Sequence, residues 1–295
     1  MAGRDAGAPQ HYSVLLEETL EYLAVRRDGI YLDLTAGLGG HTAAIAERLS
    51  SGFVIACDRD AESLELARAN TLAVGERVRF FHGAFSDLPK ALEENGVATV
   101  DGALADLGVS RYQLSSRDRG FSLMENGPLD MRMDRSQAAT AADLVNELPE
   151  KALADLIYQL GEERRSRRIS RAIVRARPIL TTGRLAEVIE GAVPRTGRLH
   201  PATQTFMALR LKVNGELEQL EEMLRLIPER LKAGARFVVL TFMSTEDRKV
   251  KQAFQAWKRA GRAKILTKHV IRPTEEEILE NAASRSAKLR ALEWI

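Results

Sequence analysis

Glycines and acidic side chains in this sequence follow short apolar runs, where they could hold a ligand. Three glycines cluster after the first such run, in "IYLDLTAGLGGHT": Gly37, Gly39 and Gly40. The next run ends at Asp58, and a later one ends at Asp106. Glycine lets the backbone approach a ligand closely and adopt a positive φ, whereas a carboxylate at a strand end accepts hydrogen bonds from ribose hydroxyls. The combination predicts a binding site for a cofactor that contains a nucleoside.

The spacing of these glycines argues against two phosphate-binding loops. The dinucleotide fingerprint G-x-G-x-x-G needs a glycine where this chain has Thr42, and the P-loop needs a lysine where it has His41. S-adenosyl-L-methionine carries no phosphate, so a looser G-x-G-G turn is sufficient for it. Phe85, at the end of the third apolar run, is placed to stack on an adenine. A glycine turn shaped only by packing is the alternative, and Asp58, Phe85 and Asp106 together favour the cofactor.

Four short apolar runs alternate with helical patterns in the first third of the chain: residues 29–34, 52–58, 78–85 and 100–108. Strands separated by helices in this way indicate a parallel sheet. Another apolar run, 235–243, follows a long helical pattern, and 263–271 with 288–295 are expected to form a closing antiparallel pair. The prediction is an α/β fold with a Rossmann-like, mostly parallel sheet, in which ligands lie beyond the carboxyl ends of the strands.

The middle of the chain has a different character. Between Arg111 and Asn214 the apolar residues recur at helical spacing, and no strand is evident. The stretch from Arg111 to Lys212 holds 18 Lys and Arg against 12 Asp and Glu, in a protein whose formal net charge is +2. This basic excess indicates either a polyanionic partner or a solvated helical region. The expected domains are a Rossmann-like one and an inserted, all-helical one: residues 1–110 with 216–295, and residues 111–215.

Bulk features exclude several protein classes. The 295 residues, 45% hydrophobic and 28% charged, suit a globular protein, and no apolar run reaches the ~18–20 residues of a membrane span. The one cysteine, Cys57, cannot form a disulfide within the chain and favours a reducing compartment, the cytoplasm. The five histidines are scattered without metal-ligand spacing, so no metal is expected.

Several longer motifs give the chain a resemblance to a known family. They are "GGH", "DLGVS", "RGFS", "GPLDMRMD", "YQLGEERRSRRISRAI", "HPATQTFMALRLKVNGELEQL" and "SRSAKLRALE". From about His11 to its C-terminus, the chain resembles the bacterial 16S ribosomal RNA cytosine N4-methyltransferases, the RsmH (MraW) family. The resemblance implies an enzyme that uses S-adenosyl-L-methionine and releases S-adenosyl-L-homocysteine. The implied substrate is the exocyclic amine of a cytidine in the decoding region of 16S ribosomal RNA, within the small ribosomal subunit.

Matching the family's cofactor contacts residue by residue gives an expected set: Gly39, Gly40, His41, Asp58, Phe85, Asp106 and Gln113. His11 could cover the cofactor or cap a helix. One motif departs from the family, which commonly has "SFHSLEDR" where this chain has "TFMSTEDR". Met243 stands at the histidine position, and a thioether cannot carry a proton. The identity of the proton acceptor is therefore open.

Asp106 is the candidate catalytic residue. Cytosine N4 is a poor nucleophile because its lone pair is delocalised into the ring, and a proton must leave it during or after methyl transfer. An acceptor at hydrogen-bond distance from the N–H serves both needs. Many amine methyltransferases use an Asp/Asn-Pro-Pro-aromatic loop for this purpose, whereas the loop here is "ADLGVSRYQL", with the acid and without the prolines. Asp106 is expected either to accept that proton or to bind the cofactor only.

Four arginines share one face of a predicted helix: Arg164, Arg168, Arg171 and Arg175. If the substrate is RNA, they could contact its phosphates, and pairing with Glu162 and Glu163 on a solvated face is the alternative. Phe121 lies in a long, glycine-punctuated loop, where it could stack on a flipped base or anchor packing. Arg210 is a further candidate for the active cleft.

Three functions remain open at this level. The first is methylation of cytidine N4 in 16S ribosomal RNA. The second is S-adenosylmethionine-dependent methylation of another amine, on DNA, protein or a small molecule. The third is a non-catalytic RNA-binding module, for which Met243 is the only support. A homodimer is also open, since the basic helices could pair across an interface.

Overall fold

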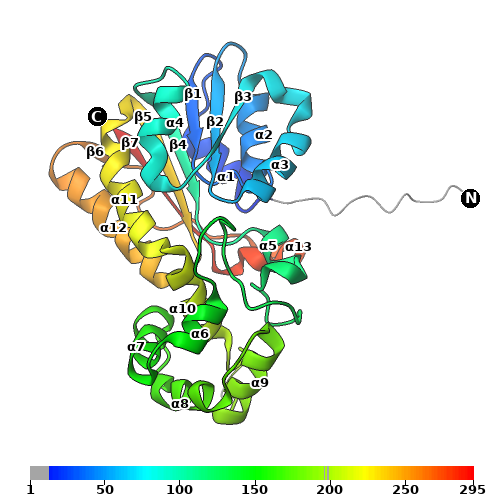
Figure 1. Cartoon of the computed structure of the whole chain (residues 1–295). Coiled ribbons are helices and arrows are strands. Elements are labelled where there is room, and N and C mark those ends of the chain that lie inside the picture. The colour runs from blue at the N-terminus through cyan, green and yellow to red at the C-terminus, as the bar shows by residue number, and fades with distance from the viewer. Residues whose placement is uncertain (1–12, 196, 198) are drawn as a thin grey trace, which may run out of the picture. The chain divides into compact units, whose positions relative to one another are not determined.

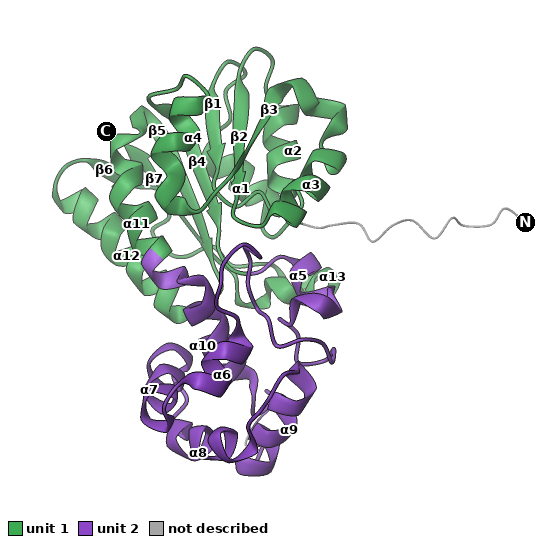
Figure 2. Ribbon diagram, viewed as in Figure 1, with its two compact units in different colours: residues 1–108, 219–295 green, residues 109–218 purple. Residues whose placement is uncertain are grey.

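The structure is a computed structural model that describes residues 13–195, 197 and 199–295. The chain divides into two compact units, which Figure 2 shows in different colours. Unit 1 comprises residues 1–108 with 219–295, and unit 2 comprises residues 109–218. The Rossmann-like and inserted domains were expected at residues 1–110 with 216–295 and at residues 111–215. His11 lies outside the described residues.

Unit 1 is built on a seven-stranded sheet (Figure 1). The strands are β1 (Ile30–Asp33), β2 (Phe53–Asp58), β3 (Val78–His82), β4 (Val100–Asp106), β5 (Leu231–Thr241), β6 (Ala263–Ile265) and β7 (Lys288–Trp294). Their spatial order is β3-β2-β1-β4-β5-β7-β6. Strands β1 to β5 pair in parallel, and β7 is antiparallel to both of its neighbours. The expected Rossmann-like α/β class is therefore confirmed, including its antiparallel closing pair.

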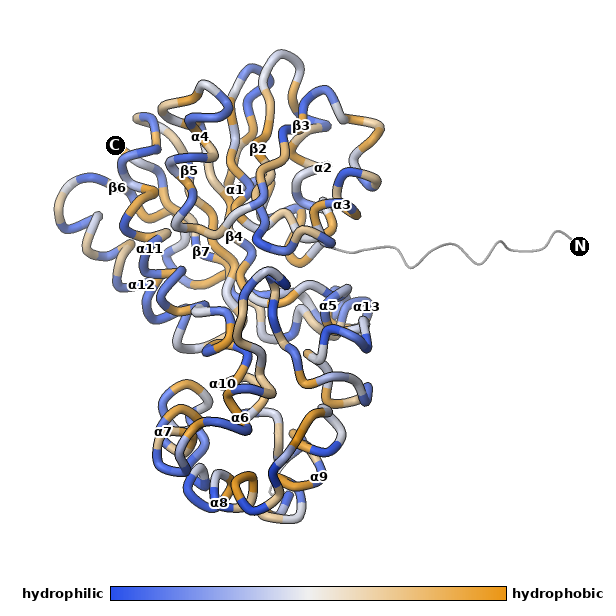
Figure 3. Tube along the Cα trace, in the orientation of Figure 1, coloured by the Kyte–Doolittle hydropathy of each residue, from blue (hydrophilic) through white to orange (hydrophobic). Residues whose placement is uncertain are grey.

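Helices cover both faces of this sheet. One apolar cluster joins the sheet to α1 (Leu16–Leu23), α2 (Gly40–Glu47) and α3 (Ala61–Asn70). The other joins it to α4 (Leu88–Glu94), α11 (Glu216–Leu226) and α12 (Ser244–Arg259). Successive strand residues point to opposite faces, so Val54 belongs to the first cluster and Ile55 to the second. Because both faces are covered, the inner strands β1, β2 and β4 are mainly apolar (Figure 3).

Shorter elements complete unit 1. They are the helix α13 (Glu275–Glu280) and the 3-10 turns Leu72–Arg77, Phe85–Asp87, Ile227–Glu229 and Ala282–Ser286. Within the described residues, no helix combines the length and the apolar character needed to cross a membrane.

The predicted run 78–85 is longer than the strand that forms. β3 ends at His82, because Asp87 closes a turn directly after it. The carboxylate of Asp87 accepts a hydrogen bond from the N–H of Ala84 at 2.9 Å, and the N–H of Asp87 donates to the carbonyl of Ala84 at 3.0 Å. Phe85 therefore lies beyond the strand, at the start of a 3-10 turn, and the prediction that it ends the strand was wrong.

Unit 2 is helical, as the apolar spacing predicted. Its helices are α5 (Arg111–Ser115), α6 (Ala141–Glu147), α7 (Glu150–Gly161), α8 (Ser166–Ala176), α9 (Thr182–Ala192) and α10 (Thr203–Asn214), with a 3-10 turn at Arg117–Arg119. Among its described residues, pairing of the strand type is limited to an isolated bridge between Pro128 and Thr181. Its core includes Ile157, Ile173 and Leu209, none of which is exposed.

The loop between α5 and α6, which contains "GPLDMRMD", is held by the last residue of α10. The Asn214 side chain accepts a hydrogen bond from the N–H of Met133 and donates one to the carbonyl of Met131, both at 2.8 Å. Met131 has φ +62°, a left-handed conformation that is rare for a bulky side chain. Two motifs far apart in the sequence thus meet, and their contact fixes a strained backbone.

Candidate functional site

The turn after β1 needs its glycines. Gly37 has φ +52° and Gly39 has φ +87°, both in the left-handed region. A Cβ on Gly39 would lie 3.2 Å from Cα of Ala67 and 3.1 Å from Cγ2 of Thr71. A side chain at this position would therefore crowd α3 and would also have to adopt a φ that L-residues rarely take.

Asp58, at the end of β2, is tied to this turn. Its Oδ2 accepts a hydrogen bond from the N–H of Gly37 at 2.8 Å, and its Oδ1 accepts one from the N–H of Asp60 at 2.9 Å. Burial raises the pKa of Asp58 to about 6, although both bonds favour the charged form. The sequence predicted that the glycines and Asp58 meet, and they do. Because each carboxylate oxygen has two lone pairs, Asp58 retains capacity to accept from hydroxyl groups.

Asp33 and its two threonines were not recognised in the sequence. Asp33 is 1% exposed; its Oδ2 accepts a hydrogen bond from the Thr42 hydroxyl at 2.6 Å, and its Oδ1 accepts one from the N–H of Thr35 at 3.1 Å. Burial raises the pKa of Asp33 to about 6. The Thr35 hydroxyl in turn accepts from the N–H of Asp106 at 2.6 Å. The signal was the acid and hydroxyls that flank the glycines in "LDLTAGLGGHT".

Asp106, the last residue of β4, is the most perturbed carboxyl of this group. Its Oδ1 is shielded from solvent and has no hydrogen-bond partner within the described residues. Burial raises the pKa of Asp106 to about 8, with further contributions from the charges of Asp33 and Glu246. A shielded carboxyl oxygen without a partner among the described residues is costly, and such groups are often found at functional sites.

His41, in the first turn of α2, faces Asp106. The ring is buried, with 5% of the residue exposed. Its Nε2 lies 3.1 Å from the carbonyl oxygen of Val14, and its Nδ1 lies 3.7 Å from Oδ2 of Asp106. Because a carbonyl can only accept, Nε2 carries a proton, and Nδ1 is the nitrogen directed at the carboxyl. The sequence had assigned His41 to the cofactor only.

Phe85 and Gln113 each have a structural role within their own unit. Phe85 is partly buried against the core cluster of unit 1, so its ring already has a packing role. Gln113, in unit 2, is 4% exposed and caps α5, since its Oε1 accepts from the N–H of Ser110 at 2.9 Å. The Ser110 hydroxyl accepts from the N–H of Gln113 in return. Cofactor contact remains a prediction for both residues.

The segment around Met243 starts α12. Met243 is the N-cap residue, and Oε2 of Glu246 accepts hydrogen bonds from the N–H groups of Phe242 and Met243, both at 3.1 Å. Glu246 is 3% exposed. This is the carboxylate half of a capping box, so the acid retained in "TFMSTEDR" has a structural role that does not need a histidine.

The four arginines are all exposed, as expected for a solvated or RNA-facing row. Arg168, Arg171 and Arg175 lie on α8, whereas Arg164 lies in the turn just before it, because the helix begins only at Ser166. The prediction that one helix carries all four was therefore wrong for Arg164.

The ion pairs of this region differ from those expected. Arg171 is within 3.5 Å of Glu150, whereas the other three arginines of the row form no ion pair within the described residues. The expected pairing with Glu163 is made instead by Arg165, through two contacts of 3.0 and 3.2 Å. RNA contact by Arg164, Arg168 and Arg171 remains a prediction.

Phe121 and Arg210 are both engaged within unit 2. Phe121 is 7% exposed and belongs to the core cluster, which is the packing alternative considered for it. Arg210 forms a two-pronged ion pair with Glu216, at 2.9 and 3.1 Å. Base stacking or RNA contact by either residue remains a prediction, and each would require the side chain to leave these partners.

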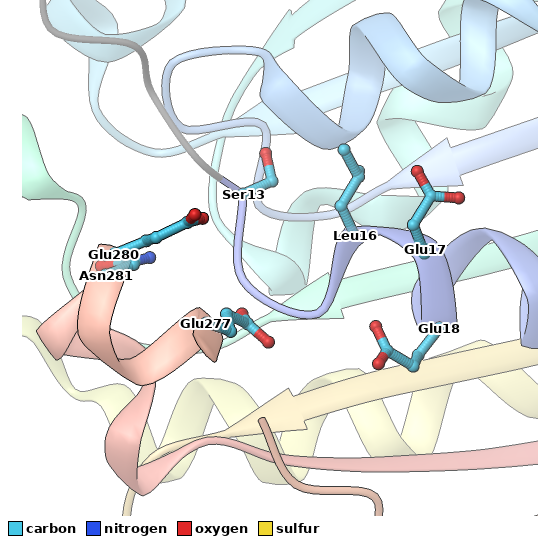
Figure 4. A pocket seen from close by; sticks show the side chains of 7 residues that line it. All are labelled: Ser13, Leu16, Glu17, Glu18, Glu277, Glu280 and Asn281. Carbon is cyan, nitrogen blue, oxygen red and sulfur yellow. The ribbon is translucent and has the colours of Figure 1, made fainter. Parts of the chain in front are cut away.

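An acidic pocket of about 370 Å³ lies between the start of α1 and α13 in unit 1 (Figure 4). Its lining residues are Ser13, Leu16, Glu17, Glu18, Glu277, Glu280 and Asn281. Glu277 accepts a hydrogen bond from the N–H of Leu15 at 2.8 Å, and burial, with the charge of Glu18, raises its pKa. The pocket therefore borders the segment whose Val14 carbonyl holds His41.

The strand ends of unit 1 fit the expected cofactor. A Cβ on Gly39 would crowd α3, Asp58 offers acceptors suited to hydroxyls, and Oδ1 of Asp106 is shielded without a partner among the described residues. Carboxyls gathered at one edge repel a phosphate and attract a positively charged sulfonium. In the described part of the chain, no group of three or more His, Cys, Asp or Glu is arranged to hold a metal ion.

The chain is similar to known proteins along almost its whole length. A model of the MraW methylase family matches residues 8–295. A ribosomal RNA small subunit methyltransferase H from Solibacter usitatus is 59% identical over 283 residues, covering 96% of this chain and 99% of its own. One of the same name from Koribacter versatilis is 47% identical, covering 95% and 93%. The solved structure of an rRNA methylase from Streptococcus thermophilus covers 99% of both chains at 12% identity and a TM-score of 0.47.

Proposed function

The chain belongs to the MraW methylase family, and from this premise we propose that it methylates the N4 amine of a cytidine in the decoding region of 16S ribosomal RNA. S-adenosyl-L-methionine, the cofactor expected from the sequence, supplies an electrophilic methyl group on a sulfonium. The names of the curated relatives support ribosomal RNA of the small subunit as the substrate. The N4 position is supported by the chemistry of Asp106.

The observation that carries the proposal is the unsatisfied Oδ1 of Asp106. In methylation of an amine, the N–CH₃ bond forms as the S–CH₃ bond breaks, and one proton leaves the nitrogen. A carboxylate that accepts a hydrogen bond from the amine draws the nitrogen lone pair out of conjugation and then receives that proton. Asp106 is a suitable acceptor because its free oxygen has no competing donor within the described residues.

Ionisation of Asp106 has to precede this step. With a pKa of about 8, the carboxyl is mostly protonated at neutral pH in the free protein. A protonated carboxyl cannot accept the proton of the amine, so we expect the rate of methyl transfer to rise with pH up to about 8. The fixed acceptor contributes a rate factor of about 10²–10⁴ if it behaves as other general bases do.

The helical unit is proposed to hold the RNA. Arg164, Arg168 and Arg175 are exposed and carry no compensating carboxylate within the described residues. Guanidinium groups in this state favour contact with phosphates. Protein or small-molecule amines would not need such a row, which favours a nucleic acid over these two alternatives.

The test is transfer of a labelled methyl group to RNA, followed by digestion and identification of the nucleoside. Naked 16S ribosomal RNA and the assembled small subunit serve as separate substrates. N4-methylcytidine at one position, lost in Asp106→Asn with cofactor affinity retained, is the expected result. Label on another nucleoside or on protein would reject the N4 proposal, and cofactor binding without any transfer would favour the non-catalytic module.

A further inference from the structure

We propose that His41 is a positioning residue that shares one proton with Asp106 and thereby makes the Asp106 carboxylate available as the acceptor. The inference rests on the proposed function of Asp106 and adds a residue that the family resemblance assigned to cofactor binding only. It is carried by the direction of the two ring nitrogens of His41.

The protein fixes the tautomer of His41. Nε2 must donate to the carbonyl of Val14, 3.1 Å away, so the neutral ring has its lone pair on Nδ1. That nitrogen faces Oδ2 of Asp106 at 3.7 Å. If either side chain rotates so that Nδ1 and Oδ2 come within hydrogen-bond distance, Nδ1 can accept a hydrogen bond from the protonated Asp106 carboxyl. Catalytic hydrogen bonds are often this long before the substrate binds.

The segment that presents Val14 is itself held in place. The neighbouring Leu15 has φ +49°, and its N–H donates to Glu277 of α13 at 2.8 Å. Val14 is 9% exposed and packs in the core cluster with Ile45 of α2. The carbonyl therefore has little freedom to turn away from Nε2, and the ring orientation follows from the fold.

The charges around Asp106 make an imidazole useful at this position. Asp33 at the end of β1 and Glu246 on α12 both disfavour a negative Asp106. When the carboxyl proton moves to Nδ1, the products are a carboxylate and an imidazolium, and their attraction offsets the repulsion from the other two carboxyls. The carboxylate then accepts the proton released by the amine. One of the two protons now held by His41 and Asp106 leaves to water through the Asp106 side chain, which is 23% exposed.

The first experiment measures how far His41 Nδ1 is protonated in the protein without cofactor or RNA. The ¹⁵N chemical shift of His41 Nδ1 is compared between wild type and Asp106→Asn, with His41→Gln used to assign the signal. Proton sharing predicts an intermediate shift in wild type and the value of an unprotonated nitrogen in Asp106→Asn. Identical shifts in the two proteins would overturn the inference. This readout needs no RNA, so it remains informative if the proposed substrate is wrong.

The second experiment measures catalysis. His41→Gln can still donate to the Val14 carbonyl and cannot take up a proton. We expect kcat to fall about 10²-fold and KM for the methyl donor to stay within about threefold. The rate should also begin to rise at a higher pH than in wild type. A loss confined to KM, with an unchanged pH profile, would show that His41 only shapes the cofactor site.

The matched control is His82→Gln. His82 also places Nε2 at 3.1 Å from a backbone carbonyl, that of Arg59, and it is exposed at the end of β3. It has the same type of hydrogen bond without the carboxyl partner. We expect its kcat and its pH profile to match those of wild type.

Discussion

Asp106 is a residue whose burial works against stability. Its pKa of about 8 in the folded protein lies above the value of about 4 for an unfolded aspartate. Between these two values the folded state binds the proton more tightly than the unfolded state, so the free energy of unfolding falls as pH rises. Such a cost is common where a carboxyl is kept for chemistry.

Replacing Asp106 with asparagine should therefore stabilise the cofactor-free protein at neutral pH. The limit for one group is about 1.4 kcal/mol per pH unit. From pH 5.5 to 7.5 we expect wild type to lose about 1–3 kcal/mol more than Asp106→Asn, measured by urea unfolding. The exposed Asp28→Asn serves as control and should follow wild type. Parallel pH dependence of Asp106→Asn and wild type would contradict the shifted pKa.

The substitution Gly39→Ala tests whether the turn after β1 needs a residue without a side chain. In Gly39→Ala the new Cβ would approach Cα of Ala67 to 3.2 Å at φ +87°, where L-residues are strained. We expect a loss of about 1–2 kcal/mol of stability and at least tenfold weaker binding of the cofactor by calorimetry. Gly75→Ala, where the Cβ would meet nothing within 4 Å, is the control. Equal affinity of both variants would separate this turn from the cofactor site.

At the scale of elements, some motifs that suggested a function also hold helices, strands and loops together. Asp247 on α12 binds Arg290 on β7 through two hydrogen bonds, at 2.7 and 3.2 Å, so "TEDR" and "SRSAKLRALE" meet in unit 1. In unit 2, Asn214 links α10 to the loop through Met131 and Met133. A motif specific to a family can thus reflect a contact between elements as well as chemistry.

Asn214→Ala should destabilise unit 2. The residue is 2% exposed, and its removal leaves the carbonyl of Met131 and the N–H of Met133 without these bonds. Each unsatisfied buried group costs about 1–3 kcal/mol, so we expect a loss of about 2–4 kcal/mol in urea unfolding. Hydrogen exchange should show faster opening near Met131, while β1 and β4 of unit 1 keep their protection. Wild-type stability would mean that the loop is held by other contacts.

At the scale of the whole molecule, the basic charge is concentrated in the inserted unit. The stretch from Arg111 to Lys212 carries the excess of Lys and Arg, whereas the rest of the chain is slightly acidic. An uneven distribution of this kind steers a polyanion toward one unit even when the net charge is near zero.

The arginines of α8 give the corresponding prediction. Arg168→Ala with Arg175→Ala should weaken RNA binding and reduce the slope of log affinity against log salt by about 0.7 per lost phosphate contact. Fluorescence anisotropy at several salt concentrations measures both. Lys258→Ala with Arg259→Ala, exposed on α12 of unit 1, makes the same change in charge and should leave the slope unchanged. Equal slopes in the two double variants would remove α8 from the RNA interface.

The sequence by itself determined the class of fold, the insertion and the meeting of the glycine turn with Asp58. These depend on local patterns: alternating strands and helices, helical apolar spacing, and glycines that only a positive φ explains. Membership of a family gave the rest of the expected cofactor set. Phe85 was misplaced relative to its strand because a turn closed by Asp87 is a contact of individual atoms, which a run of apolar residues does not record.

The tertiary structure alone decided what the buried polar groups do. The hydrogen bond between Asp33 and Thr42, although both flank the glycine turn, and the position of His41 between Val14 and Asp106 follow only from the fold, because the partners come from separate strands and helices. The shifted pKa of Asp106 likewise results from burial and from carboxyls that only the fold brings near. Spacing along a chain encodes backbone geometry, whereas proton affinity depends on neighbours in three dimensions.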